Sequence, residues 1–155
     1  MENLIKKFYQ SFEQLDAEGM ASCYHSDIEF EDPAFGILKG EKAKNMWRML
    51  CDSQKRKDFK VIFSAIKANE HEGVAHWEAF YTFSKTGKKV HNIIEAKFEF
   101  KDGKIIKHTD QFDLYRWAKQ ALGFQGVILG WSSFFKNKLN AQTNYLLSKF
   151  EEKAK

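Results

Sequence analysis

Residues 89–115, KVHNIIEAKFEFKDGKIIKHTDQFDLY, carry the pattern from which the architecture of this chain follows. On both sides of Asp102 and Gly103, apolar residues alternate with polar ones, as they do in β-strands that bury one face. Asp-Gly is also the residue pair that a tight type I′ hairpin turn favours. The segment therefore predicts two long antiparallel strands joined by a short turn.

Two more strand patterns precede this hairpin, and helical patterns come before them. DFKVIFSAIKA (from Asp58) and GVAHWEAFYTFS (from Gly73) both resemble strands. Earlier in the chain, apolar residues recur at the three- and four-residue steps of a helix, at Ile5, Phe8, Phe12 and Leu15 and again at Ala43, Met46, Trp47, Leu50 and Cys51. Asp16 has the position of an N-cap between them. Helices followed by an antiparallel meander indicate an α+β fold, in which a curved antiparallel or mixed sheet wraps around N-terminal helices as a cone.

The C-terminal part returns to helical spacing. Its expected buried face is supplied by Phe134, Phe135, Leu139, Leu146, Leu147 and Phe150. We expect a single domain overall, with the α+β cone in residues 1–113 and a helical extension in residues 114–155 packed on it. Trp117 and Trp131 in this extension are expected to cover the mouth of the cone or to lie at a subunit contact.

Composition and charge bound the class of protein. The chain has 155 residues, of which 43% are hydrophobic, and a formal charge of +4. No apolar run approaches the roughly 20 residues that a membrane helix needs, and the N-terminus lacks a signal-peptide core. Lysines and acids are interspersed, so no basic face for nucleic acid is expected. Cys23 and Cys51 suit small buried thiols. These features predict a cytoplasmic protein with no nucleic-acid or membrane partner.

The stretch DIEFEDPAFG (27–36) contains the chain's only proline. Alternation puts Asp32 on the same strand face as Ile28 and Phe30. Pro33 disfavours a helical conformation for Asp32 and ends the strand. The pattern therefore predicts a carboxylate held at the rim of the cone.

The last strand places a second carboxylate inside. Because Lys107 belongs in solvent, the opposite face points inward and carries Ile106, His108, Asp110 and Phe112. On the strand from Gly73 both faces are partly apolar, so alternation alone does not orient His76 and Glu78. An inward His108–Asp110 pair is either a buried histidine satisfied by its neighbour or an acid/base site with shifted pKa values. Asp32, reaching the same interior, favours the acid/base site.

Other site classes lack their signatures. His76, His91, His108, Glu78 and Asp110 are of metal-ligand types, but none shows HExxH or closely spaced Cys/His ligands, so no metal site is expected. No glycine-rich phosphate loop follows a strand, and no cofactor is expected. Most aromatic residues belong to the core. A pocket, if present, would be lined by Phe30, Trp47, Phe80, Ile94, Phe98 and Phe112.

FYQSFEQLDAEGMASCYHSDIEFEDPAFGILKG and FKDGKIIKHTDQFD resemble the opening and the final hairpin of the SnoaL-like branch of the nuclear transport factor 2-like superfamily. That branch includes ketosteroid isomerases, limonene epoxide hydrolases and polyketide cyclases. The resemblance runs from about Ile5 to Asp113, and the tail is also similar to that of uncharacterised members. It implies a cone-shaped α+β barrel with a deep apolar pocket for a small hydrophobic ligand, and a homodimer packed through the outer face of the sheet.

The residues of those enzymes carry over only in part. Asp32 matches the proton-shuttling aspartate of the isomerases, but the two oxyanion donors fall near Phe8 and Ala96, which argues against steroid isomerisation. Against the epoxide hydrolases, Asp110 matches one carboxylate of an Asp-Arg-Asp triad. His76 and Glu78 fall at the Arg-x-Asp pair, and Phe30 and Asp32 at the Tyr-x-Asn. The resemblance thus implies that His76 and Glu78 point inward.

Three functions stay open. The first is a cofactor-independent isomerase, cyclase or hydrolase, in which Asp110, oriented by His108, acts as general base and Asp32 or Glu78 as its partner. The second is a non-catalytic module that binds a hydrophobic ligand or serves as a dimeric accessory domain. The third is a structural dimer whose cone is filled by its own aromatic side chains.

Overall fold

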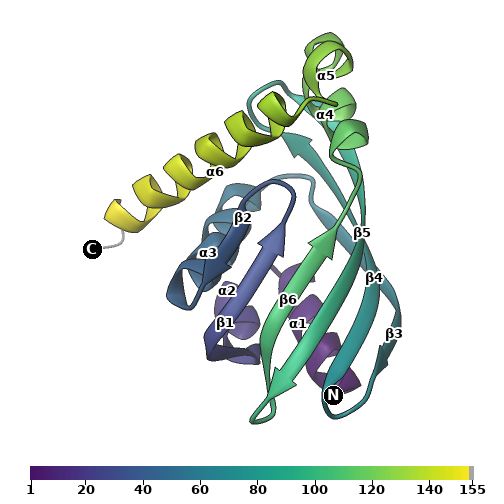
Figure 1. Cartoon of the computed structure of the whole chain (residues 1–155), viewed down its shortest axis with the longest axis vertical. Helices are drawn as coiled ribbons and strands as arrows, with labels where there is room; N and C mark the ends of the chain where they lie inside the picture. The colour runs from purple at the N-terminus through teal and green to yellow at the C-terminus, as the bar shows by residue number, and fades with distance from the viewer. Residues whose placement is uncertain (154–155) are drawn as a thin grey trace.

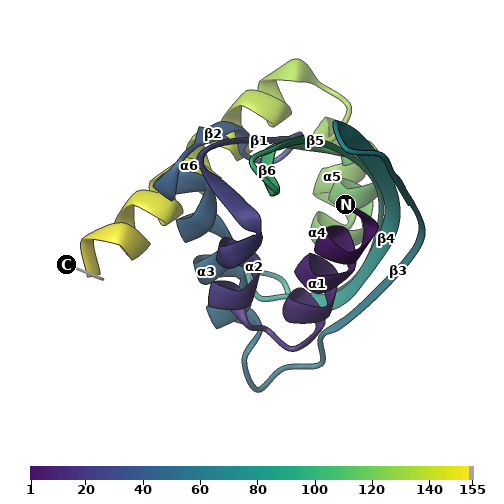
Figure 2. The same cartoon turned by 90° about the horizontal axis from the view of Figure 1, so that it is seen from below.

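The computed structural model describes residues 1–153, which form one curved six-stranded sheet with helices packed in its concave side (Figures 1 and 2). The strands are β1 (Tyr24–Asp32), β2 (Gly36–Lys39), β3 (Lys60–Ala68), β4 (Glu72–Phe83), β5 (Lys88–Lys101) and β6 (Lys104–Gln111). The helices are α1 (Glu2–Glu13), α2 (Ala17–Cys23), α3 (Glu41–Gln54), α4 (Leu114–Leu122), α5 (Phe124–Leu129) and α6 (Ser133–Lys153). The predicted α+β cone is confirmed.

The sheet is mixed, with the order β2-β1-β6-β5-β4-β3. Strands β3 to β6 form the expected antiparallel meander, and β1 joins it parallel to β6. Asp102 and Gly103 have φ angles of 51° and 69°, the left-handed pair that a type I′ turn requires. The Asp-Gly hairpin is therefore confirmed.

A bulge near this hairpin corrects the expected face of Ile106. Glu99 pairs with Lys107, whereas Phe100 pairs with Ile105, so Ile106 is an extra residue without an opposite partner. The bulge shifts the alternation by one residue: Ile105 is fully buried and Ile106 is only half-buried. On β6, side chains alternate strictly between the two faces of the sheet only after this bulge.

The core fills the concave side of the sheet. The α1 stripe is confirmed at Ile5, Phe8 and Phe12, and Tyr9 beside it is equally buried, whereas Leu15 is half-exposed. On α3 the buried side chains are Ala43, Met46, Trp47 and Cys51. The N-cap prediction is also confirmed, because the side chain of Asp16 accepts a hydrogen bond from the backbone N–H of Gly19.

Strand β2 was not expected from the sequence, which indicates only a turn after Pro33. It is four residues long and pairs with the end of β1, Phe30 opposite Leu38. Its single deeply buried side chain is Leu38, 1% exposed. A strand this short leaves too little alternation to detect.

The C-terminal helices cover the wide end of the cone (Figure 1). Helix α4 packs Trp117, Ala118 and Ala121 against Val90 of β5. On α6 the buried face is narrower than expected: Leu147 is fully buried, whereas Phe134 and Leu146 are 68% and 49% exposed. Phe135, Leu139 and Phe150 are half-buried.

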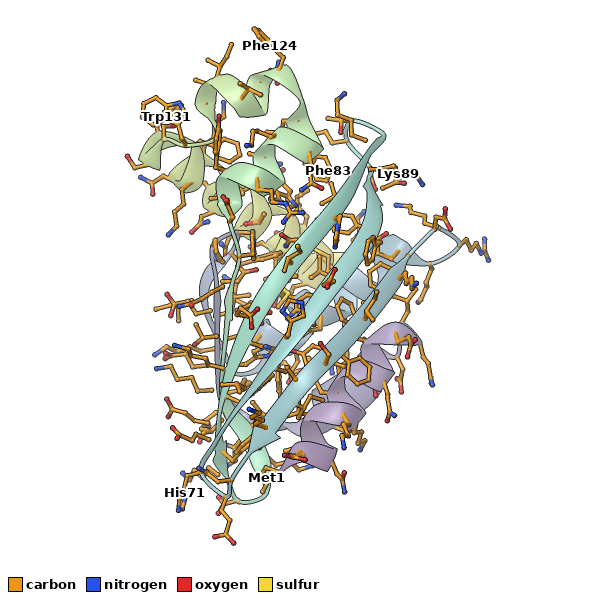
Figure 3. The ribbon with its side chains drawn as sticks, turned by 90° about the vertical axis from the view of Figure 1, so that its right-hand side faces the viewer. Met1, His71, Phe83, Lys89, Phe124 and Trp131 are labelled. Carbon is orange, nitrogen blue, oxygen red and sulfur yellow. The ribbon has the colours of Figure 1, made fainter. Side chains whose placement is uncertain are left out.

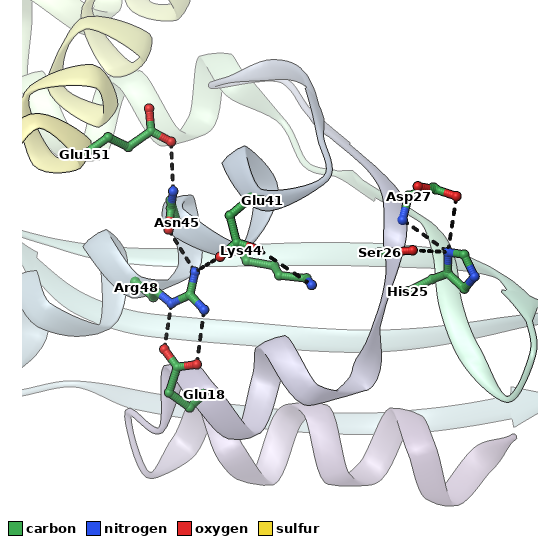
Figure 4. Close-up of polar contacts among 9 residues, drawn as sticks. All are labelled: Glu18, His25, Ser26, Asp27, Glu41, Lys44, Asn45, Arg48 and Glu151. Atoms are coloured by element: carbon green, nitrogen blue, oxygen red, sulfur yellow. Dashed lines mark hydrogen bonds and ion pairs between the residues drawn. The ribbon is translucent and has the colours of Figure 1, made fainter. Parts of the chain in front are cut away.

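Polar contacts fasten the helices to one another (Figure 4). Arg48 of α3 donates to both carboxylate oxygens of Glu18 on α2, at 2.6 and 3.0 Å, and also contacts Glu41. Asn45 of α3 donates to Glu151 of α6 at 2.9 Å. Bidentate arginine pairs of this kind fix geometry more firmly than single ion pairs. Within residues 1–153, no helix combines the length and the apolar character needed to cross a membrane.

Candidate functional site

Two polar side chains of β6 point into the apolar interior. His108 is fully buried and Asp110 is 3% exposed, which confirms the face predicted for both. They are neighbours on one strand face, two residues apart, and their side chains meet: Nε2 of His108 lies 3.0 Å from Oδ1 of Asp110.

A chain of hydrogen bonds fixes the direction of each proton in this pair. The indole N–H of Trp47 donates to the Tyr24 hydroxyl at 2.8 Å, and that hydroxyl lies 2.7 Å from Nδ1 of His108. Because an indole can only donate, the Tyr24 hydroxyl accepts from Trp47 and its own O–H can donate a hydrogen bond to Nδ1 of His108. Nε2–H then donates to Asp110, and the indole of Trp77 donates to the same Oδ1 at 3.1 Å. Among residues 1–153, Oδ2 of Asp110 has no hydrogen-bond partner.

Aromatic rings enclose the histidine. The ring centroids of Phe8, Phe30, Phe98 and Trp47 lie 5.3, 5.3, 4.5 and 6.0 Å from that of His108. Phe30, Trp47, Phe98 and also Ile94 were expected to line a pocket; they are at most 2% exposed and pack as core. The narrow part of the cone is therefore filled by its own side chains, and within residues 1–153 the side-chain hydrogen bonds of His108 are those to Asp110 and Tyr24.

Asp32 lies at the end of β1 as predicted. Its Oδ1 accepts hydrogen bonds from the backbone N–H groups of Ala34 and Phe35, at 3.0 and 2.6 Å. Burial raises the pKa of Asp32 to about 7, and the charge of Asp110 acts in the same direction, against the two backbone hydrogen bonds. Asp32 itself is half-buried, and the turn at Pro33 holds its carboxyl group where the charge of Asp110 still contributes to its pKa.

Helix α6 covers the turn that carries Asp32. Asn140 donates to the carbonyls of Pro33 and Ala34 at 2.9 and 2.8 Å, Thr143 donates to Ala34 at 2.8 Å, and Asn144 donates to Phe35 at 2.9 Å. The C-terminal helix thereby contributes to the burial that shifts the pKa of Asp32.

Tyr9 is a site residue that the sequence did not indicate. Its side chain is fully buried, and its hydroxyl has no hydrogen-bond partner in the part of the chain that the structure describes. Burial raises its pKa well above the usual range, and the charge of Asp110 raises it further. An unpaired buried hydroxyl costs about 1–3 kcal/mol. The helical stripe drew attention to Phe8, whereas the adjacent Tyr9 lies with its ring centroid 5.8 Å from that of Trp77, whose indole binds Asp110.

Tyr81 connects the site to the C-terminal helices. Its hydroxyl accepts a hydrogen bond from the Trp117 indole on α4 at 2.7 Å. Burial, with a smaller contribution from the charge of Asp32, raises its pKa. Phe112 is half-buried and packs against both the main core and the α4 cluster.

His76, Glu78 and Phe80 lie on the opposite face of the sheet, so the expected inward orientation was wrong. On β4 it is Ala75, Trp77 and Ala79 that are buried, because the large Trp77 side chain fills the interior and its N–H reaches Asp110.

On the outer face these residues form a cluster of their own. Glu78 lies 3.2 Å from Nε2 of His76 and 2.5 Å from Nε2 of His91, and Nδ1 of His76 lies 2.6 Å from Glu95. Phe80 stacks on His91 with ring centroids 4.1 Å apart. The hydrogen bonds to Glu95 and Glu78 raise the pKa of His76, whereas those from His91 and His76 lower the pKa of Glu78.

Among residues 1–153, the interior site coincides neither with a group of metal-ligand side chains nor with either of the two surface grooves. No group of three or more His, Cys, Asp or Glu side chains within residues 1–153 is arranged to hold a metal ion. Two surface grooves of about 380 and 830 Å³ do not include Asp32, His108 or Asp110 among their lining residues. The smaller groove runs past Phe80 and His91.

Comparison with known proteins identifies relatives of this chain. The model of the SnoaL-like domain matches residues 5–108. No curated protein matches the chain.

Solved structures share its fold. An "LEH-like epoxide hydrolase" of M. tuberculosis is 20% identical, with a TM-score of 0.63, and the match covers 81% of this chain and 90% of that one. A putative polyketide cyclase of Xanthomonas campestris is 17% identical, with a TM-score of 0.61 and coverage of 77% and 94%. A protein of unknown function from Burkholderia pseudomallei, described as similar to nuclear transport factor 2, is 12% identical, with a TM-score of 0.64 and coverage of 77% and 95%.

Proposed function

Since this chain belongs to the SnoaL-like family, we propose that its interior acts on a small hydrophobic molecule by acid–base chemistry that needs no cofactor. The observation that carries the proposal is a pair of carboxyl groups in unlike surroundings, Asp110 buried on β6 and Asp32 half-buried at the end of β1. Two N–H donors converge on one oxygen of Asp110 and leave the other free. Asp32 has a pKa raised to about 7, so a large fraction of it is protonated at neutral pH.

The two groups suit opposite roles. Asp110, oriented by His108 and Trp77, would accept a proton at Oδ2 from a substrate carbon or from an attacking water. Protonated Asp32 would donate its proton to the substrate oxygen on which negative charge develops. In an isomerisation or ring closure the proton gained by Asp110 balances the one lost by Asp32. In the hydrolysis of an epoxide, water supplies both the nucleophilic oxygen and the proton that returns to the enzyme.

The hydroxyl of Tyr9 adds a third polar group to this interior. It is buried, lacks a partner among residues 1–153 and is close enough to Asp110 to sense its charge. A neutral phenol of high pKa is a hydrogen-bond donor to an oxyanion. Tyr9 would thus take the role for which the first helix otherwise offers only Phe8.

Similar solved structures agree with this reaction class. One similar structure is described as an epoxide hydrolase and another as a putative polyketide cyclase. Both kinds of reaction depend on proton transfer and involve no redox step. The fold alone does not select between them.

The test is turnover of a panel of epoxides and enones by the protein and by two asparagine variants. Asp110→Asn is expected to lower kcat/KM by about 10²–10⁴-fold, the usual contribution of a general base. Asp52→Asn is the matched control, because Asp52 is an exposed helical residue that pairs only with Lys55. Unchanged turnover in Asp110→Asn would remove Asp110 from the chemistry.

A second candidate is a module that binds a hydrophobic ligand without reaction. The enclosure of His108 by aromatic rings favours it, because a filled narrow end leaves less room for chemistry. Thermal unfolding in the presence of fatty acids, steroids and terpenoids separates the two candidates. A ligand that raises Tm and is recovered unchanged supports binding alone. If no ligand raises Tm and no substrate turns over, the interior is structural.

We further propose a cytoplasmic homodimer joined through the outer face of the sheet. Ile62 and Val74 are each 44% exposed on that face, and apolar side chains in such positions suit a subunit contact. The free, buried thiols of Cys23 and Cys51 suit a reducing compartment. Analytical ultracentrifugation of Val74→Lys tests the dimer: the variant is expected to be monomeric.

A further inference from the structure

The end of the molecule formed by α5 and the start of α6 exposes large apolar side chains. We call these residues the apolar tip: Phe124, Val127, Ile128, Leu129, Trp131 and Phe134, which are 77%, 47%, 49%, 50%, 73% and 68% exposed. Figure 3 shows Phe124 and Trp131 projecting outward at the opposite end of the molecule from Met1 and His71. Single exposed apolar residues are ordinary, but a contiguous group of this size marks an interaction site.

The packing of α5 is the reverse of that of a usual surface helix. Its buried residue is Gly126, and a Cβ added there would lie 2.0 Å from the carbonyl oxygen of Ala118 on α4. Gly130 makes a similar approach to the Ala118 side chain. A surface helix normally buries its large apolar side chains and exposes the rest. Here the glycine side faces the protein, and the large side chains are left on the outside.

Positive charge surrounds the tip. Residues 114–150 contain no aspartate or glutamate, and their charged residues are Arg116, Lys119, Lys136, Lys138 and Lys149. The β4–β5 turn brings Lys85, Lys88 and Lys89 to the same end, where the Lys88 side chain lies beside Gly123 and Thr86 donates to the carbonyl of Ala121. Asp113 caps α4, and Asp58 pairs with Lys89.

We propose that the apolar tip inserts into the surface of an anionic membrane. Aromatic and aliphatic side chains on an exposed turn enter the boundary between headgroups and acyl chains, while surrounding lysines contact anionic headgroups. The tip projects from the body of the protein (Figure 3), so it can reach such a surface without other parts of the protein colliding with it.

Charge favours lipid over a second copy of the chain as the partner. Two tips meeting about a two-fold axis would bring their lysine-rich borders together, and like charges in contact oppose association. An anionic surface is complementary to the same border. The expectation from the sequence that the protein has no membrane partner depended on the absence of a long apolar run. The absence of such a run argues against a transmembrane helix, but shallow insertion of a few side chains does not require one.

The intact protein carries its own reporter for the test. Trp131 is 73% exposed, whereas Trp47, Trp77 and Trp117 are 2%, 7% and 7% exposed. A blue shift of tryptophan emission on adding vesicles therefore reports Trp131 entering an apolar environment. Sedimentation with vesicles of phosphatidylcholine containing about 30 mol% phosphatidylserine measures binding, and vesicles of phosphatidylcholine alone give the reference.

Two variants divide the apolar part of the interaction from the electrostatic part. Phe124→Ser combined with Ile128→Ser is expected to weaken binding about tenfold or more, with an unchanged Tm, because both side chains are exposed. Lys136→Glu combined with Lys138→Glu is expected to weaken binding to the anionic vesicles by a similar factor and to reduce its salt dependence. The matched control is Ile37→Ser combined with Leu146→Ser, two residues 56% and 49% exposed outside the tip.

Two results would overturn the proposal. One is that the unaltered protein does not bind the anionic vesicles, or binds them no better than phosphatidylcholine alone. The other is that the protein forms a dimer in the absence of lipid and that the Phe124/Ile128 variant is monomeric by analytical ultracentrifugation. In that case the tip is a contact between two copies of the chain.

Discussion

The interior of the cone and the apolar tip depart from the usual distribution of side chains in opposite directions. In the interior, Asp110 is 3% exposed and His108 is fully buried, although charged and polar side chains normally remain in water. At the tip, Phe124 and Trp131 are 77% and 73% exposed, although side chains of this size normally carry the burial energy of a domain.

The two regions differ in how their unusual side chains are compensated. Within the interior, indole and phenol donors satisfy Oδ1 of Asp110 and Nδ1 of His108, whereas the Tyr9 hydroxyl has no partner among residues 1–153. At the tip, no contact within the described chain covers the exposed rings. Hydrogen bonds and packing within the protein therefore account for most of the interior, whereas for the tip we propose a partner outside the chain. Identical substitutions in the two regions should separate these cases.

The largest difference is expected from one substitution made in both regions. Ile94→Ser places a hydroxyl and a void in the core, where Ile94 is 1% exposed, and should lower the free energy of unfolding by about 3–5 kcal/mol. Ile128→Ser changes a side chain that is 49% exposed, and should alter it by less than about 0.5 kcal/mol. Urea unfolding of both variants measures the difference.

Equal losses in the two variants would break this comparison. A large loss for Ile128→Ser would mean that the tip is part of the folding core of the C-terminal helices. The exposed rings would then need no external partner. A small loss for Ile94→Ser would instead mean that the interior tolerates a polar group because it is hollow.

The next effect in size is the pH dependence that Asp32 brings to stability. Its pKa rises from 3.8 to about 7 on folding, so the folded protein holds this proton more tightly than the unfolded chain. The corresponding stability is fully present below about pH 4 and is lost as the pH rises to about 7, a change on the order of 3 kcal/mol. Asp32→Asn should abolish it, and its side-chain oxygen can still accept from Ala34 and Phe35.

Urea unfolding of the protein and of Asp32→Asn at about pH 4, 5.5 and 7 tests this. The difference between the two proteins isolates Asp32, because other groups, such as His76 on the outer face, titrate in both. Parallel stability curves across this range would show that Asp32 is ionised in the folded protein at neutral pH. The assignment of Asp32 as the acid would then be wrong.

The smallest effect concerns α6, which joins the two regions. Asn140→Ala removes the donor to the carbonyls of Pro33 and Ala34 and should lower the free energy of unfolding by about 1–2 kcal/mol. Because water then reaches the turn, the pKa of Asp32 should also fall toward its ordinary value. Asn137→Ala, at an exposed position of the same helix, should change neither. If the pKa of Asp32 is the same in Asn140→Ala as in the unaltered protein, the sheet and α4, and not α6, bury this carboxyl group.

The sequence predicted those parts of the fold in which apolar residues recur at a single spacing, either that of a helix or that of a strand. The α1 stripe at Ile5, Phe8 and Phe12 and the Asp-Gly turn follow from spacing and from left-handed backbone angles, both of which are local. The inward face of β6 followed from a single lysine, Lys107, that had to reach solvent. In each case a local feature of the sequence was compatible with only one arrangement of the backbone or of the strand face.

The sequence did not determine which face of β4 points into the core. On β4 both faces carry apolar residues, and the comparison with epoxide hydrolases favoured His76 and Glu78 inside. Packing selected Trp77 instead, because its volume and its N–H both fit beside Asp110. Such a choice depends on neighbours from other elements, which one strand's pattern does not contain.

Some site features depend on long-range contacts alone. The unpaired hydroxyl of Tyr9 follows from how α1 lies against the sheet. The shift of the Asp32 pKa follows from burial, to which the Asn140 and Thr143 contacts more than a hundred residues along the chain contribute. The sequence supplied Asp32 itself, through the proline that follows it, but not the helix that covers it.

The most direct test of the interior acid–base pair is a titration of the Asp32 carboxyl carbon by ¹³C NMR, in the protein and in Asp110→Asn. We predict a midpoint near the value of about 7 in the protein and a lower midpoint in the variant, because the neighbouring negative charge is removed. A midpoint near the ordinary 3.8, or one that Asp110→Asn leaves unchanged, would contradict the pairing of the two carboxyl groups.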